Sequence, residues 1–172
     1  IKKVICNDRY GMIYEKIHSK KSLGRLCHDE PENIKFFGKE FARETVILHS
    51  TKCDIPGMRN YKEYYLDLYK TKKQDKILTP KLIDLINSEI EERNTCIHGD
   101  LTVGNIIFAD NKWYWIDLGR IGYGDPVFDL MTPYFSFNLL SQFRFVRDIF
   151  HMSKEQLKEL WDSFIEEYAR LT

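Results

Sequence analysis

The sequence predicts an α+β fold in which helices dominate and the strands are short. Apolar residues recur at helical spacing through most of the chain after residue 30. Two short apolar runs, Asn105–Phe108 and Trp113–Ile116, lie on either side of Ala109–Lys112, which is the pattern of a β-hairpin. Apolar residues make up 43% of the 172 residues and aromatic residues 14%, which suffices for one packed domain and excludes disorder.

The first part of the chain is expected to be extended. Lys2–Cys6 and Met12–Ile17 have the composition of strands, and a turn over Asn7–Gly11 separates them. Ser22–His28 is expected to form a short helical stretch or a loop that ends before Pro31.

Three helices are expected between this region and the hairpin. The first spans Glu32–Thr51 and the second spans Tyr61–Tyr69. Thr79 and Pro80 have the residue types of an N-cap and a first helical position, so the third helix is expected over 79–93. The apolar stripe of the first helix consists of Phe37, Phe41, Thr45 and Leu48.

Further helical segments are expected after the hairpin. One covers Asp125–Tyr134, and the next runs from about Asn138 to Phe150. Ser153 and Gln156 have the spacing of a capping box, which predicts a final helix that reaches about residue 170.

The charge balance excludes some classes of partner. The 26 basic and 26 acidic residues cancel, so no overall field attracts nucleic acid or an anionic membrane. No apolar run approaches the roughly 18 residues of a membrane span, and no signal peptide is recognisable. The four cysteines are scattered, which favours free thiols in a reducing compartment. We therefore expect a cytoplasmic protein.

The chemistry is predicted from residues 96–130. Phosphoryl transfer from a nucleotide needs one carboxylate that orients or deprotonates the attacking hydroxyl, and it needs an amide oxygen and a second carboxylate that hold Mg²⁺. Asp100, Asn105 and Asp117 supply these groups in that order. A hairpin brings its two open ends together, so Asn105, which opens the first strand, is expected beside Asp117. Two oxygen ligands side by side suit Mg²⁺, which keeps several waters.

These residues resemble a known family. The pattern H-G-D-x-x-x-x-N, a hairpin, I-D-x-G and then G-D-P-x-x-D-L resembles the aminoglycoside phosphotransferase and choline kinase family of small-molecule kinases. The resemblance covers most of the chain and is densest over 96–130. It implies a protein-kinase-like fold, in which 1–17 would be the end of the small lobe and the hinge strand. Residues 18–172 would form the large C-terminal helical lobe, with the catalytic hairpin and the acceptor-binding helices.

The resemblance also implies roles. Asp100 would be the catalytic carboxylate and Asn105 and Asp117 the Mg²⁺ ligands, while His98 and Asp125 would brace the catalytic loop. For His98, a bracing bond to backbone and direct proton transfer both remain open. The base of ATP would lie against the hinge backbone at Glu15, Lys16 and Ile17.

The implied reaction transfers the γ-phosphoryl group of ATP to the hydroxyl of an amino-alcohol, aminoglycoside or sugar-like compound. A cationic acceptor would need carboxylates or aromatic faces near Asp100. The candidates are Asp125, Asp129 and Tyr134, with Phe135 and Phe137, and with Trp161 and Glu166 or Glu167 on the final helix. A loop-bracing role for Asp129 and ordinary core packing of the aromatic residues are the alternatives.

Two features expected of a complete kinase of this kind are missing from the sequence. These are a Gly-rich phosphate-covering hairpin and a strand lysine, since the sole G-x-G is Gly122–Gly124, after Asp117. We therefore expect a fragment of an enzyme. The alternative is a non-catalytic kinase-like lobe, or pseudokinase, that serves as a binding module. A protein kinase is disfavoured because no A-P-E sequence follows Asp117.

Overall fold

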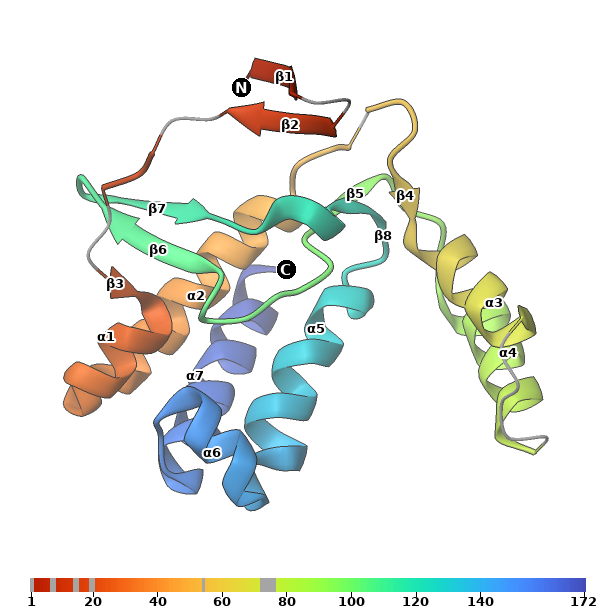
Figure 1. The fold of residues 1–172 in the computed structure, drawn as a ribbon. Coiled ribbons are helices and arrows are strands. Elements are labelled where there is room, and N and C mark those ends of the chain that lie inside the picture. Colours follow the sequence, from red (N-terminus) through yellow and green to blue (C-terminus); the bar gives the residue numbers. More distant parts are fainter. Residues whose placement is uncertain (1, 7–8, 14–15, 19–20, 54, 72–76) are drawn as a thin grey trace.

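The computed structural model describes residues 2–6, 9–13, 16–18, 21–53, 55–71 and 77–172. Strands β1 (Lys2–Cys6) and β2 (Arg9–Ile13) form an antiparallel hairpin, drawn at the top of Figure 1. The first predicted strand is confirmed. The second was placed wrongly at Met12–Ile17, because the pairing with β1 already begins at Arg9, and the described residues 16 and 17 are irregular.

The predicted hairpin of residues 105–116 is confirmed, with both strands shifted by one residue toward the turn, which shortens the turn to two residues. Strands β6 (Ile106–Ala109) and β7 (Lys112–Trp115) pair antiparallel, and β3 (Lys21–Ser22) adds to the other edge of β6. The turn residues Asp110 and Asn111 both have positive φ angles, 51° and 59°. This conformation matches the right-handed twist of two-residue hairpins, and Asn and Asp adopt it more readily than other side chains.

Three short strands form a second small sheet. Its strand order is β4 (Arg59–Asn60), β8 (Gly122–Gly124) and β5 (Thr95–Ile97), with β4 parallel and β5 antiparallel to β8. None of these strands was predicted, because two or three residues are too few to show an alternating pattern.

Helix α1 (Leu23–Asp29) occupies the region where a helix or a loop was expected. The Ser22 hydroxyl accepts a hydrogen bond from the Arg25 N–H at 3.2 Å and thereby caps the helix. The predicted helix at Glu32–Thr51 is divided into a 3₁₀ turn, η1 (Pro31–Asn33), and α2 (Ile34–His49).

Helix α2 packs against α7 (Lys154–Leu171), and the two lie side by side in Figure 1. A Cβ atom at Gly38 would lie 2.1 Å from the Ser163 Oγ and 2.9 Å from the Leu160 carbonyl oxygen, so only glycine permits this approach. The capping box that opens α7 is confirmed, with both the Ser153 and the Gln156 hydrogen bonds present. The completely buried side chains of this core include Phe41, Phe137, Leu157, Leu160 and Phe164.

Helices α3 (Tyr61–Thr71) and α4 (Leu78–Glu89) form a separate pair at the right of Figure 1. The prediction of Thr79 as an N-cap is wrong, because α4 already begins at Leu78 and Thr79 lies inside its first turn. The helix also ends before residue 93, since Ile90 has an extended backbone with ψ at 116°.

The predicted helix from Asn138 to Phe150 begins later than expected. Helix α5 (Val127–Pro133) continues as a π-helical segment, η3 (Tyr134–Leu139), and then as a 3₁₀ turn, η4 (Leu140–Gln142). Phe143 is extended, and α6 (Arg144–Phe150) follows it. Pro133 has no N–H for a regular helical bond, and the hydrogen-bond pattern changes directly after it.

Two expectations from composition can be compared with the fold. Cys27, Cys53 and Cys96 are buried free thiols. Burial raises the pKa of Cys27 to about 12 and that of Cys96 to about 11, so both thiols stay protonated. Within the described ranges, no helix is both long and apolar enough for a membrane crossing.

Candidate active site

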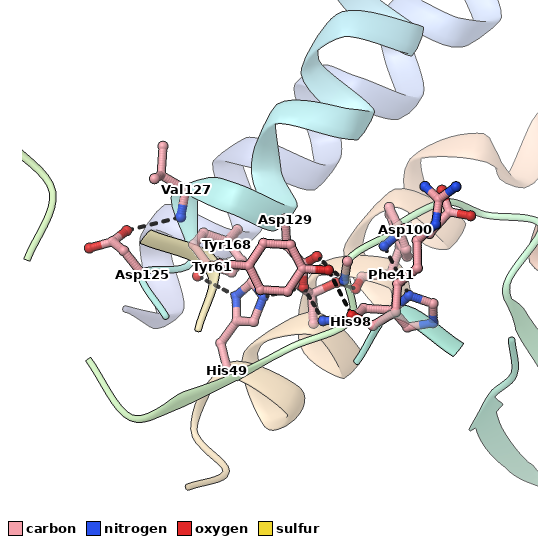
Figure 2. Close-up of polar contacts among 12 residues, drawn as sticks. Phe41, His49, Tyr61, His98, Asp100, Asp125, Val127, Asp129 and Tyr168 are labelled. Atoms are coloured by element: carbon pink, nitrogen blue, oxygen red, sulfur yellow. Dashed lines mark hydrogen bonds and ion pairs between the residues drawn. The ribbon is translucent and has the colours of Figure 1, made fainter. Parts of the chain in front are cut away.

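The loop of residues 98–105 contains the predicted catalytic residue Asp100 and is therefore called the catalytic loop. One buried carboxylate anchors its start. Asp129 lies in the first turn of α5 and is completely buried. Its Oδ2 accepts the His98 N–H at 2.7 Å, and its Oδ1 accepts the Gly99 N–H at 2.7 Å (Figure 2). This geometry fits the loop-bracing interpretation of Asp129.

A third donor reaches the same carboxylate from α2. The Nε2 of His49 lies 3.1 Å from the Asp129 Oδ2, and its Nδ1 lies 2.8 Å from the Tyr168 hydroxyl (Figure 2). Because a carboxylate only accepts, Nε2 donates, and in a neutral ring Nδ1 then accepts the Tyr168 O–H. Burial, with the nearby charges of Asp125 and Asp129, raises the pKa of Tyr168 to about 12, so its hydroxyl keeps the proton.

This network was not predicted from the sequence. His49 continues the four-residue spacing of Phe41 and Thr45 on the buried face of α2. A buried histidine needs polar partners, so its position on this face was the one feature of the sequence that indicated a buried polar network.

His98 is also completely buried, and both ring nitrogens contact backbone. Nε2 lies 3.0 Å from the Ile116 carbonyl oxygen and therefore donates, while Nδ1 accepts the Asp100 N–H at 3.3 Å. The ring thus joins Asp100 to the residue that precedes Asp117. This arrangement favours a bracing role and leaves neither nitrogen for a substrate.

Further hydrogen bonds join Asn105 to both sides of the site. Its Nδ2 donates to the Asp100 carbonyl oxygen at 2.9 Å. This bond fixes the orientation of the amide and does not involve its Oδ1. Its carbonyl oxygen accepts the Ile116 N–H at 2.9 Å. The open ends of the hairpin therefore meet, and Asn105 lies beside the segment that leads into Asp117.

Asp117 is exposed and has a left-handed backbone, with φ 56° and ψ 48°. Residues other than glycine seldom adopt this conformation, and those that do are concentrated at functional sites. In the described part of the chain, no group hydrogen-bonds its carboxylate, and no cluster of three His, Cys, Asp or Glu side chains is present. An oriented amide oxygen and a free carboxylate nevertheless fit Mg²⁺, which takes one or two protein ligands beside water and phosphate.

Tyr61, from the start of α3, fills the space between Gly99 and the segment after Asp117. Its hydroxyl donates to the Arg120 carbonyl oxygen at 2.7 Å. Gly99 has φ +80°, and a Cβ atom there would lie 1.7 Å from this hydroxyl and 2.6 Å from the Arg120 oxygen. A side chain is therefore excluded at Gly99. Tyr61 was not predicted as a site residue, because nothing in its sequence context marks it.

Asp125 lies at the entrance to α5. Its Oδ1 accepts the Val127 N–H at 2.9 Å, and its Oδ2 lies 3.4 Å from the Arg93 Nε. Its side chain is only 18% exposed, so these contacts take up most of its surface. Asp125 thus braces the turn between β8 and α5.

A cavity of about 520 Å³ opens beside Asp100, within the size range of small-molecule sites. Residues from α1, the catalytic loop, α5, η3 and the end of α6 line it. They are Ser22, Gly24, Arg25, His28, Asp100, Thr102, Val103, Gly104, Thr132, Ser136, Ile149, Phe150 and His151.

The three side chains predicted to contact substrate do not line this cavity. Asp129 is completely buried, and Asp125 is held at the entrance to α5. Tyr134 packs edge-on against Trp161, with ring centroids 5.5 Å apart, and Phe137 is completely buried in the core. The side chains predicted to bind a cationic acceptor therefore do not surround this cavity.

The residues predicted to meet the nucleotide base are only partly described. Glu15 lies outside the described residues. Lys16 is exposed and Ile17 is half-buried, and both lie in an irregular segment after β2.

Comparison with known families assigns the chain to a class of enzyme. The family model described as the phosphotransferase enzyme family (APH) matches residues 16–170. The chain belongs to this family, as the pattern over 96–130 predicted. Comparison with curated proteins gives no match. Membership supports a kinase-like phosphotransferase that acts on small molecules.

Proposed function

We propose that this chain carries the catalytic lobe of an ATP-dependent O-phosphotransferase, which transfers the γ-phosphoryl group of ATP to a hydroxyl of a small molecule. Residues 18–172 would form the large helical lobe, and 1–17 the end of the small lobe and the hinge. One observation carries the proposal. Hydrogen bonds join Asp100, Asn105 and the segment before Asp117 into one braced unit beside a cavity of small-molecule size.

Asp100 would act on the acceptor. Asp100 lines the cavity, and its carboxylate would align the acceptor hydroxyl or accept its proton. Its position depends on His98, which binds the Asp100 N–H, and on Asp129, which binds the two preceding N–H groups. Such positioning supplies much of the rate in phosphoryl transfer.

Asn105 and Asp117 would hold Mg²⁺ through the amide Oδ1 and the carboxylate. The bound ion would offset negative charge on the phosphates of ATP. The adenine base would lie against the hinge backbone at residues 15–17, where the matched family segment begins.

The test is an acceptor screen with the full-length protein, ATP and Mg²⁺, in which ADP and the phosphorylated product are measured by mass spectrometry. Asp100→Asn should abolish transfer and leave ATP binding largely intact. Asp110→Asn is the matched control, because Asp110 is exposed in the hairpin turn and asparagine tolerates its left-handed backbone. Transfer that survives Asp100→Asn would contradict the proposal. ATP binding without transfer to any acceptor would favour the non-catalytic module.

A further inference from the structure

The residues that line the cavity beside Asp100 do not favour a cationic acceptor. Among the described residues that line it, Asp100 is the only carboxylate. Three side chains that can carry positive charge, Arg25, His28 and His151, share the lining. The carboxylates at 125 and 129 that were expected to meet a cation lie elsewhere.

Arg25 shares its carboxylate partner with Lys21. Its Nε lies 2.9 Å from the Asp29 carboxylate, and Lys21 lies 2.8 Å from the same group. The hydrogen bond from Lys21, with those from His28 and Arg25, holds the pKa of Asp29 well below its usual range. The Arg25 side chain is 58% exposed, so its guanidinium group is accessible to a ligand in the cavity.

Two histidines share the lining of the cavity with Arg25. Their rings pack edge to face with centroids 5.9 Å apart. His28 uses Nδ1 to contact Asp29 at 3.0 Å, which leaves Nε2 on the side away from that contact. His151 ends α6 with φ 53°, a position that usually holds glycine. Residues in such strained conformations are concentrated at functional sites, which supports a ligand-binding role for the His151 ring.

The rest of the lining suits a hydroxylated compound. Thr132 and Ser136 supply hydroxyl groups from α5 and η3, and Ile149 and Phe150 supply an apolar surface. Small-molecule sites commonly combine an apolar wall with a few polar groups that fix orientation.

We infer that the acceptor is a small hydroxyl compound that carries an anionic group, either a carboxylate or a phosphate. Its hydroxyl would lie at Asp100, and its anionic group would bind Arg25, His28 and His151. Guanidinium groups bind both kinds of anion through paired hydrogen bonds. The inference rests on the proposed function, because it names the substrate of that same site.

The test uses four compounds with one carbon skeleton: glycerol, glycerate, glycerol 3-phosphate and 3-amino-1,2-propanediol. Binding to the full-length protein is measured by ligand-observed NMR without nucleotide, and kcat/KM is measured with Mg·ATP. We expect glycerate or glycerol 3-phosphate to bind at least about tenfold more tightly than the amine, and this preference should weaken as salt is added. Whichever of the two anions binds more tightly shows whether the site prefers a carboxylate or a phosphate group.

Arg25→Gln should weaken binding of the preferred anion by about tenfold. The binding of glycerol and the KM for ATP should not change. Arg144→Gln is the matched control. Arg144 also pairs with an aspartate four residues later, Asp148 at 3.5 Å, but it does not line the cavity.

The outcomes separate this inference from the proposed function. If an anion binds, Arg25→Gln weakens this binding, and no compound is phosphorylated, the anion site stands and the proposed kinase activity is refuted. Transfer to the amine with equal efficiency would retain the kinase and overturn the inference. The inference would also be overturned if neither anion binds, or if Arg25→Gln changes only the KM for ATP.

Discussion

His49 Nε2 lies 3.1 Å from Asp129 Oδ2, although the two residues are 80 positions apart in the chain. The His49 side chain is 3% exposed and that of Asp129 is completely buried. Because Asp129 also binds the backbone of His98 and Gly99, this contact connects the end of α2 to the catalytic loop. The position of Asp100 therefore depends on the packing of helices far from it in sequence.

The first prediction concerns this contact. His49→Ala removes one of three donors to a buried carboxylate, so it should lower the free energy of unfolding by about 1–3 kcal/mol. It should also lower kcat and change the KM for ATP little, because His49 touches neither substrate. Tyr168→Phe removes only the outer hydroxyl and should cost less. Urea unfolding and steady-state kinetics measure both effects, and equal costs for the two variants would refute this order.

The second prediction concerns Gly99. Gly99→Ala should destabilise the fold more than Gly57→Ala or Gly104→Ala. Gly57 has a similar φ of +81°, but no described atom lies within 4 Å of the place that a Cβ would take, so its substitution should cost about 1–2 kcal/mol of backbone strain alone. Gly104 has neither a positive φ nor a close neighbour and serves as the control in the same loop. Thermal unfolding of the three variants would show whether Tyr61 adds the expected steric cost.

The third prediction separates the metal ligand from the group that acts on the acceptor. Asp117→Asn should weaken binding of Mg·ATP by at least about tenfold, because it removes the charged ligand and leaves neutral amide oxygens. Asp100→Asn should lower turnover without this loss. Calorimetric titration of ATP at several Mg²⁺ concentrations measures the difference. Similar and small effects of both substitutions would contradict the assignment of roles.

The fourth prediction concerns acid stability. Arg170 and Arg43 hydrogen-bond the Glu167 carboxylate and lower its pKa to about 2. The unfolded chain takes up this proton near pH 4.3, so the stabilisation is complete above that pH and is lost as the pH falls toward 2. Glu167→Gln should therefore be less stable than the wild type at pH 7, and the difference should shrink between pH 4.5 and 2. Unfolding at stepped pH values measures this, with the exposed Glu32→Gln as the control.

Local sequence determined the parts of the site that depend on short-range geometry. Asn105 and Asp117 flank a hairpin whose turn residues favour its backbone, so their proximity follows from about a dozen residues. The capping box at Ser153 is equally local, because its two hydrogen bonds span three residues. The family pattern lies in the same continuous segment, which is why it was recognisable.

Tertiary structure decided which side chains support the site and what surrounds it. Tyr61 lies against Gly99, and His49 and Tyr168 support the loop through Asp129; the three side chains come from different helices, and no spacing along the chain relates them to Asp100. The cavity likewise combines Arg25 and His151, which are far apart in sequence, and it leaves Asp129 buried behind the loop. Packing alone places a side chain on a cavity wall or behind it, because residue type and local spacing are compatible with both positions.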